Sequence, residues 1–294
     1  MSTLIPLSVR GNAPVYDPTK STTAKKIDGM TFRQSYAGGS YVYSGVVYTD
    51  AIKIGSLTFS NYAFEVCETS KTQVGGPPYG TFGLNIDPNG MPTKPDRIKS
   101  WFPAVMGYLH APLFAVDYHR STSKGTFDFG FIDENKYTGS IGYTSVLANN
   151  GGQWVVSISG FAVGTTFIKR SFNTLVDTGG VATLQFPRWA IDRYFAQVPN
   201  STWNEARNSY QFPCDNVKYP LPDIVFGVGD SVKLTIPGKN LEHVLFNSAL
   251  NQCGTYITAG SDDQVLWAKK VIENLYVVFD YGNRRMGFAN KVSF

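Results

Sequence analysis

The chain has 294 residues, which is enough for two domains or one large β protein. Only 16% of the residues are charged, whereas Phe, Tyr, Gly and Pro, the residues of half-buried strands and tight turns, are abundant. The net charge of +4 is spread over scattered Lys and Arg residues, which argues against a nucleic-acid-binding surface. No stretch approaches the ~20 apolar residues of a membrane span.

The first residues, Met1 to Pro6, contain neither the basic nor the apolar region of a secretory signal. We therefore expect a cytoplasmic protein, or a secreted one if the natural N-terminus is longer. Three cysteines allow at most one disulfide bridge and one free thiol. No pair of the three histidines has metal-ligand spacing, so we expect neither a metal ion nor a cofactor.

Along the chain, the hydrophobic pattern mostly has the period of two that is typical of strands. Residues 31–50 predict a hairpin that turns at 37–40, and residues 51–65 predict two more strands. Helical signals occur at 92–110, where prolines limit the helix to short pieces, and at 187–197, which begins with proline. Further short strands are predicted at 113–117, 125–133, 139–147, 153–163, 167–175 and across 210–294. These elements predict an all-β protein with sandwich-like or barrel-like lobes.

A hydrophobic run beginning at Phe172 leads into Asp177-Thr178-Gly179 and resembles the active-site strand of fungal pepsin-like aspartic proteases. Segments at 15–24, 112–116, 127–140 and 276–289 resemble the same family in the same order. The resemblance implies a bilobal, all-β pepsin-like fold. It implies an incomplete N-terminal lobe at 1–138, with a flap hairpin, and a C-terminal lobe at 139–294 that carries Asp177. It also implies a disulfide between Cys214 and Cys253.

The family's chemistry needs two aspartates that share a proton, one from each lobe. This sequence contains one Asp-Thr-Gly and no Asp-Ser-Gly, and only fourteen residues precede the segment at 15–24. Other positions also depart from the family pattern. Ala37 follows the flap tyrosine Tyr36, Gly180 stands where the family has Thr or Ser, and Trp267 stands where it has a supporting glycine.

We expect Asp177 to act as a lone acid or base, or else to be a relic in a turn that the fold requires. Tyr36, Thr178, Gly179 and Trp267 are the candidate substrate-binding residues of the cleft between the lobes, with Trp267 equally a core residue. The first hypothesis is conversion of a small organic or peptide-like substrate by a cyclase or isomerase of a biosynthetic pathway. One alternative is an aspartic endopeptidase whose first aspartate comes from a longer gene product or a second chain. The other is a binding pseudo-protease without turnover.

An incomplete first lobe would leave the edge of a sheet exposed, and exposed edges pair with other strands. We expect residues 1–10, a partner strand or a homodimer to cover this edge.

Overall fold

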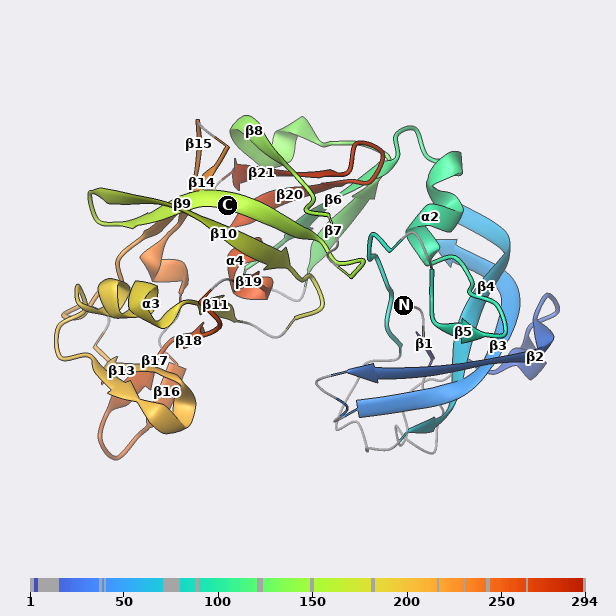
Figure 1. The fold of residues 1–294 in the computed structure, drawn as a ribbon, viewed down its shortest axis with the longest axis horizontal. Helices are drawn as coiled ribbons and strands as arrows, with labels where there is room; N and C mark the ends of the chain where they lie inside the picture. Colours follow the sequence, from blue (N-terminus) through green and yellow to red (C-terminus); the bar gives the residue numbers. More distant parts are fainter. Residues whose placement is uncertain are drawn as a thin grey trace. The chain divides into compact units, whose positions relative to one another are not determined.

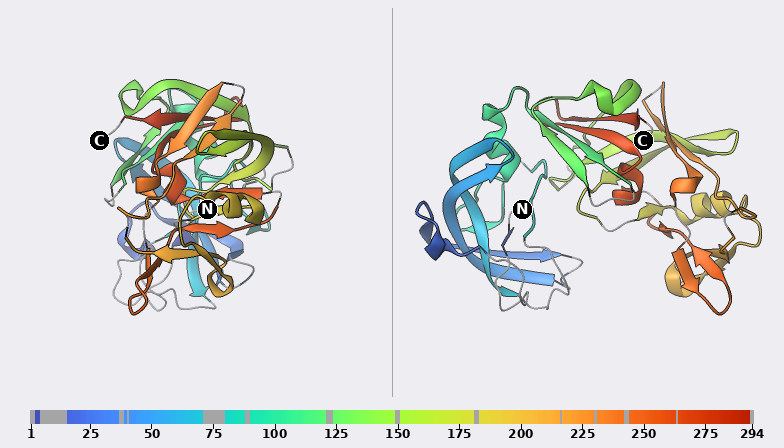
Figure 2. Two further views of the ribbon diagram at one scale, coloured as in Figure 1. Left: turned by 90° about the vertical axis from the view of Figure 1, so that its left-hand side faces the viewer. Right: turned by 180° about the vertical axis from the view of Figure 1, so that it is seen from behind.

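The computed structural model describes residues 3–4, 16–36, 39, 41–70, 80–87, 90–120, 124–148, 151–180, 183–215, 217–229, 231–241, 244–262 and 264–292. The chain forms two compact units, Met1–Leu109 and His110–Phe294 (Figure 1; Figure 2). This division falls earlier than the predicted boundary after residue 138. The reason is that β6 (Leu113–Tyr118) pairs with β20 (Leu275–Asp280), near the C-terminus, and thereby belongs to the second unit.

The first unit is built on one five-stranded sheet in the order β1-β4-β3-β2-β5. Figure 1 shows its three central strands as long, curved neighbours. The strands are β1 (Thr3–Leu4), β2 (Lys25–Tyr36), β3 (Tyr41–Ile54), β4 (Leu57–Ser70) and β5 (Thr93–Lys94). β2 and β3 form the predicted hairpin, which starts earlier than expected because a register shift between Lys26 and Thr31 extends it. Gly29 lies in that shift with a φ of +75°, which favours glycine.

Thr3 and Leu4 run parallel to β4, opposite Glu65 and Val66. They lie on the edge of the sheet that β4 would otherwise form, where the sequence predicted a cover from residues 1–10. Residues 5–10 lie outside the described residues.

A buried carboxylate ties the segment that precedes β2 to β3. Asp50 accepts hydrogen bonds from Tyr16 Oη (2.6 Å), Ser21 Oγ (2.9 Å), Thr23 Oγ1 and the Ala51 amide (2.7 Å). Burial raises the pKa of Asp50, but these hydrogen bonds outweigh it and lower the pKa to about 2. The segment from Tyr16 to Ala24, which includes η1 (Pro18–Lys20), is thereby fixed to the sheet.

Short helices complete the first unit, as the prolines at 95 and 103 predicted. They are α2 (Trp101–Val105) and η3 (Met106–Tyr108). Trp101 is fully buried and packs its ring against Phe59 and Phe82. None of the helices in the described part of the chain is long and apolar enough to cross a membrane.

The described residues of the second unit form three sheets. The seven-stranded sheet has the order β15-β14-β9-β10-β19-β11-β18, the five-stranded sheet β7-β6-β20-β21-β8, and the four-stranded sheet β12-β13-β17-β16. The remaining strands are β7 (Gly125–Phe129), β8 (Tyr137–Ser145), β9 (Val155–Val163), β10 (Thr166–Val176), β11 (Leu184–Phe186), β12 (Thr202–Asn204), β13 (Ser209–Pro213), β14 (Ile224–Val228), β15 (Val232–Ile236), β16 (Val244–Asn247), β17 (Gln252–Gly254), β18 (Ile257–Ala259), β19 (Gln264–Trp267) and β21 (Arg285–Lys291). The all-β prediction is therefore confirmed.

The helices of the second unit are short and follow strands. They are η4 (Glu134–Lys136), α3 (Arg188–Phe195), η5 (Glu205–Arg207), η6 (Gly238–Asn240) and α4 (Lys269–Ile272). α3 lies within the predicted helical segment at 187–197, and Pro187 stands at its N-cap position.

Aromatic rings fill the core of the second unit. Phe114 stacks on Phe279 with ring centroids 4.6 Å apart, and Phe161 meets Phe186 edge-on at 4.8 Å. Such pairs contribute about 0.5–1.5 kcal/mol each beyond the area they bury. The core therefore holds the strands that carry the candidate site.

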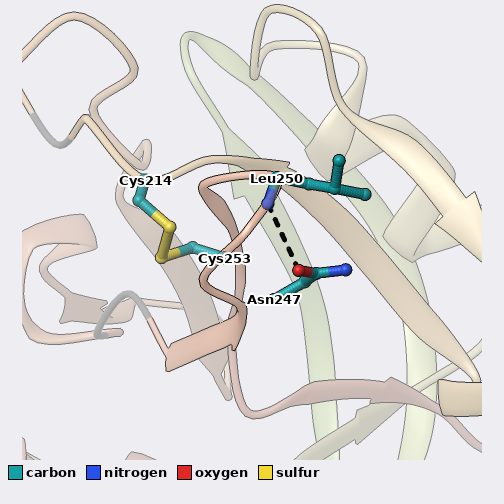
Figure 3. Close-up of a disulfide and its surroundings, with 4 residues drawn as sticks. All are labelled: Cys214, Asn247, Leu250 and Cys253. Carbon is teal, nitrogen blue, oxygen red and sulfur yellow. Dashed lines mark hydrogen bonds between the residues drawn. A yellow bond between two sulfur atoms is a disulfide. The ribbon is translucent and has the colours of Figure 1, made fainter.

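A disulfide joins Cys214, which follows β13, to Cys253 in β17 (Figure 3). This is the pair that the resemblance implied. The connection after β16 turns at Leu250, whose amide donates to Asn247 Oδ1 at 3.2 Å (Figure 3). Cys67 is a buried thiol of the first unit that takes no part in the disulfide, and its Sγ donates to Thr69 O at 3.1 Å.

Candidate active site

The loop that carries Asp177 follows β10 directly. β10 pairs antiparallel with β9 on one side and parallel with β19 on the other, where Val176 stands opposite Trp267. The Asp177 amide continues this ladder by donating to Trp267 O at 3.0 Å. The backbone of the aspartate is therefore fixed by a strand that follows it by 90 residues.

Two glycines shape the turn after Asp177. The Gly179 amide donates to Asp177 Oδ1 at 2.9 Å, and the Gly180 amide donates to Asp177 O at 3.3 Å. A hydrogen bond from a backbone N–H to a carboxylate is charge-assisted and directional, so it fixes the orientation of the carboxyl group. The Asp177 side chain is half-buried.

The position of Gly180 faces the other carboxylate oxygen. A Cβ built at this position would lie 3.2 Å from Asp177 Oδ2 and 3.0 Å from the Ala268 Cβ. A Ser or Thr at 180 would thus place its hydroxyl group in the immediate surroundings of the carboxylate. Glycine lacks this hydroxyl group. The departure from the family pattern at position 180 therefore removes a possible hydrogen-bond donor to the Asp177 carboxylate.

Tyr118, the last residue of β6, holds the middle of the loop. Its hydroxyl donates to Thr178 O at 3.1 Å. Burial raises the pKa of Tyr118, and the nearby Asp177 charge raises it further, so this hydroxyl remains a donor at neutral pH.

The backbone at Tyr118 is itself anchored by ion pairs. Lys291 Nζ donates to Tyr118 O and lies 2.5 Å from Asp117 Oδ1, while His119 Nε2 lies 3.3 Å from Asp117 Oδ2. Asp117 is buried, so the lysine compensates a charge that would be costly to bury alone. Sequence reasoning missed Tyr118, Asp117 and Lys291, because no local pattern links residues 60 to 173 positions apart.

A pocket of about 380 Å³ lies beside this loop. Its walls come from the end of β6, the start of β7, the aspartate loop and the first residue of α4. The lining residues are Tyr118, His119, Lys124, Gly125, Phe127, Thr178, Gly180 and Lys269. Among the described residues, no group of three or more His, Cys, Asp or Glu side chains could hold a metal ion.

The predicted substrate-binding residues have different surroundings in the structure. Thr178 lines the pocket, and Gly179 holds the carboxylate. Trp267 is 0% exposed, with its ring 4.8 Å from that of Phe226 and 5.5 Å from that of Phe288. These contacts place Trp267 in the core and favour that interpretation over a wall of the binding site. Tyr36 ends β2 in the first unit, and its side chain lies outside the described residues.

Comparison with known proteins agrees with the geometry. The model of the eukaryotic aspartyl protease family matches residues 8–291. The chain is 34% identical over 285 residues to endothiapepsin from Cryphonectria parasitica, an alignment that covers 94% of this chain and 65% of that protein. It is 32% identical over 282 residues to penicillopepsin-1 from Talaromyces stipitatus, covering 95% and 69% respectively. With aspergillopepsin-1 from Aspergillus oryzae it shares 30% identity over 289 residues, covering 98% and 71%.

The chain thus spans about two thirds of the length of these curated relatives. The matches nevertheless extend over nearly all of its own sequence, and they include the loop of Asp177. Together with the all-β architecture, they show that the chain belongs to the pepsin-like family of eukaryotic aspartyl proteases.

Proposed function

We propose that this chain supplies one of the two aspartates of an endopeptidase site, and that the second carboxylate comes from outside the 294 residues. The observation that carries the proposal is the Asp177 carboxylate. It is held by the Gly179 amide on an Asp-Thr-Gly loop, in a chain whose family is that of the aspartyl proteases. The sequence contains no second motif of this kind, and the relatives named above are longer than the chain.

The chemistry explains why one aspartate is not enough. Hydrolysis of a peptide needs an ionised carboxylate that activates water and a protonated one that polarises the carbonyl group. Asp177 can perform only one of these tasks at a time. Because the Gly179 amide holds Oδ1, we assign proton transfer to Oδ2, the oxygen next to Gly180.

Cleavage of a denatured protein at acid pH tests the proposal. Asp177→Asn is the matched control, because it keeps the shape of the side chain and removes its acid–base chemistry. If a second copy supplies the other aspartate, the rate per chain rises with chain concentration, and added Asp177→Asn chains reduce it.

If a longer gene product supplies the second aspartate, that product alone cleaves, at a rate proportional to its concentration. Equal cleavage by wild type and Asp177→Asn would contradict the proposal. So would the absence of cleavage by the chain and by any longer product of its gene.

The pocket, which Gly180 helps to line, favours a second candidate function, the binding and conversion of a small substrate. The described lining residues of the pocket all belong to the second unit and lie beside the Asp177 loop, so a small ligand could bind there without a second aspartate. A single positioned acid can convert a reactive small organic or peptide-like substrate, as a cyclase or isomerase does. The Asp177→Asn variant would bind such a substrate but would not convert it to product. Binding without turnover by the wild type as well would favour the pseudo-protease.

A further inference from the structure

The pocket beside the Asp177 loop combines basic and aromatic side chains. Its lining includes two lysines, Lys124 and Lys269, together with His119, and it contains no Asp or Glu among the described residues. The Asp117 carboxylate contacts His119 through Oδ2 and Lys291 through Oδ1. Even with Asp177 ionised behind Thr178 and Gly180, the formal charges around the pocket leave an excess of positive charge. These surroundings favour an anion.

The backbone positions of the basic residues are set by the fold. The His119 amide donates to Lys124 O at 3.1 Å and thereby closes the connection between β6 and β7. Ala268, directly before Lys269, donates its amide to Thr183 O at 3.1 Å. Both lysine side chains are exposed, so solvent and a dissolved ligand have access to them.

An aromatic wall stands beside these charges. Phe127 in β7 is 39% exposed, and the rings of Tyr118 and Phe127 meet edge-on with centroids 5.8 Å apart. Gly125, opposite Tyr118 in the strand pair, makes room for this arrangement, since a Cβ there would lie 3.2 Å from Tyr118 Cδ1 and 2.7 Å from Asp117 O. The pocket therefore offers an apolar face to a ring and cations to an acid.

We propose that this pocket binds a small carboxylate that carries one aromatic ring. Its volume of about 380 Å³ lies near the lower end of the range for small-molecule sites, which suits one ring and a short acid better than an extended peptide. The ligand is either a free organic acid or the C-terminal residue of a peptide, for which the chemistry of recognition is the same. This inference adds the chemical class of the ligand to the second candidate function, and it concerns binding at neutral pH, which requires neither turnover nor a second aspartate.

Three ligands test the proposal by NMR titration of the ¹⁵N-labelled full chain at neutral pH. N-acetylphenylalanine carries the ring and a carboxylate, N-acetylphenylalaninamide has the same shape without the charge, and 3-phenylpropionate lacks the peptide group. We expect both acids to shift the amides of Gly125, Thr178 and Gly180 with a Kd of about 1 mM or below. The amide should bind at least about fivefold more weakly, since it loses the charge pairing. The tighter of the two acids identifies the source of the ligand.

Variants make the test specific. Lys124→Gln with Lys269→Gln should weaken binding of the acids about fivefold or more and leave the affinity for the amide unchanged. Lys169→Gln is the matched control, because Lys169 is exposed and lies on β10 eight residues, or about 25 Å along the strand, from Asp177. Asp177→Asn should retain binding of the acids while it abolishes cleavage, which separates this proposal from the proposed function.

Two results would overturn the inference. One is equal affinity for the acid and the amide, and the other is unchanged binding in the double lysine variant. Absence of any shift at the three amides up to about 10 mM ligand would do the same.

Discussion

Replacing Trp267 by alanine tests whether this residue belongs to the core or to the binding site. The side chain is 0% exposed and packs against Phe226 and Phe288. A buried tryptophan removes about 150–250 Å² from water, and at about 25 cal/mol/Å² this corresponds to roughly 4–6 kcal/mol. The unfolded chain already buries part of that area, so we expect Trp267→Ala to lower the free energy of unfolding by about 3–5 kcal/mol.

A urea titration of the full chain measures this loss. Four of the five tryptophans, at 154, 189, 203 and 267, lie in the second unit, so fluorescence and near-UV circular dichroism report mainly on its unfolding. Trp267→Phe is the conservative control and should lose less stability, because a ring still fills most of the volume. Since the residue also pairs with Val176, the alanine variant should increase hydrogen exchange at the Asp177 amide.

The result that would refute the reasoning is a loss below about 1 kcal/mol for Trp267→Ala, which is typical of a poorly packed or exposed side chain. Weaker ligand binding at unchanged stability would likewise restore Trp267 as a wall of the binding site.

Three further predictions concern the anchors of the two units. Removing the disulfide by Cys214→Ser with Cys253→Ser should lower the free energy of unfolding by up to about 4 kcal/mol, because the bridge closes a loop with a sequence separation of 39. The loss should appear as a lower urea midpoint, and an unchanged midpoint would show that the bridge does not restrain the unfolded chain. The hydrogen bonds to Asp50 lower its pKa from 3.8 in the unfolded chain to about 2 in the fold. They therefore stabilise the fold fully at pH values above 3.8, and this stabilisation is lost as the pH falls from about 4 to 2. Wild type should therefore exceed Asp50→Asn in thermal stability at pH 5 and approach it near pH 2, and a constant difference would contradict the assignment. Tyr118→Phe should cost about 0.5–1.5 kcal/mol and increase hydrogen exchange at the Gly179 amide, whereas unchanged exchange would show that the bond to Thr178 O does not hold the loop.

Local sequence patterns predicted several elements of the fold, including the strand that leads into Asp177. The apolar run before Asp177 forms β10, the alternating residues after Thr31 lie in the β2–β3 hairpin, and the proline at 187 stands at the start of α3. In each case, neighbouring residues determine the structure through strand periodicity, turn formation or the fixed φ of proline. The type of these elements was therefore readable from the sequence.

The surroundings of Asp177 were not readable in the same way. Tyr118 reaches the aspartate loop from β6, and Lys291 reaches Tyr118 from β21, so their roles depend on how distant strands pair. The predicted boundary between the lobes at 138 differed for the same reason, because β6 pairs with a strand near the C-terminus. For Trp267, the sequence showed a large residue at a glycine position, and only the packing revealed where its ring lies.

The parallel pairing of β10 with β19 also has a consequence for biosynthesis. Asp177 leaves the ribosome 90 residues before Trp267, whose carbonyl group fixes the aspartate backbone. At about 5–20 residues per second, the loop waits roughly 5–20 s for its partner strand. During that interval one side of β10 remains open to pairing with other chains, so the tempo of translation over residues 178–267 becomes a determinant of the yield of folded protein.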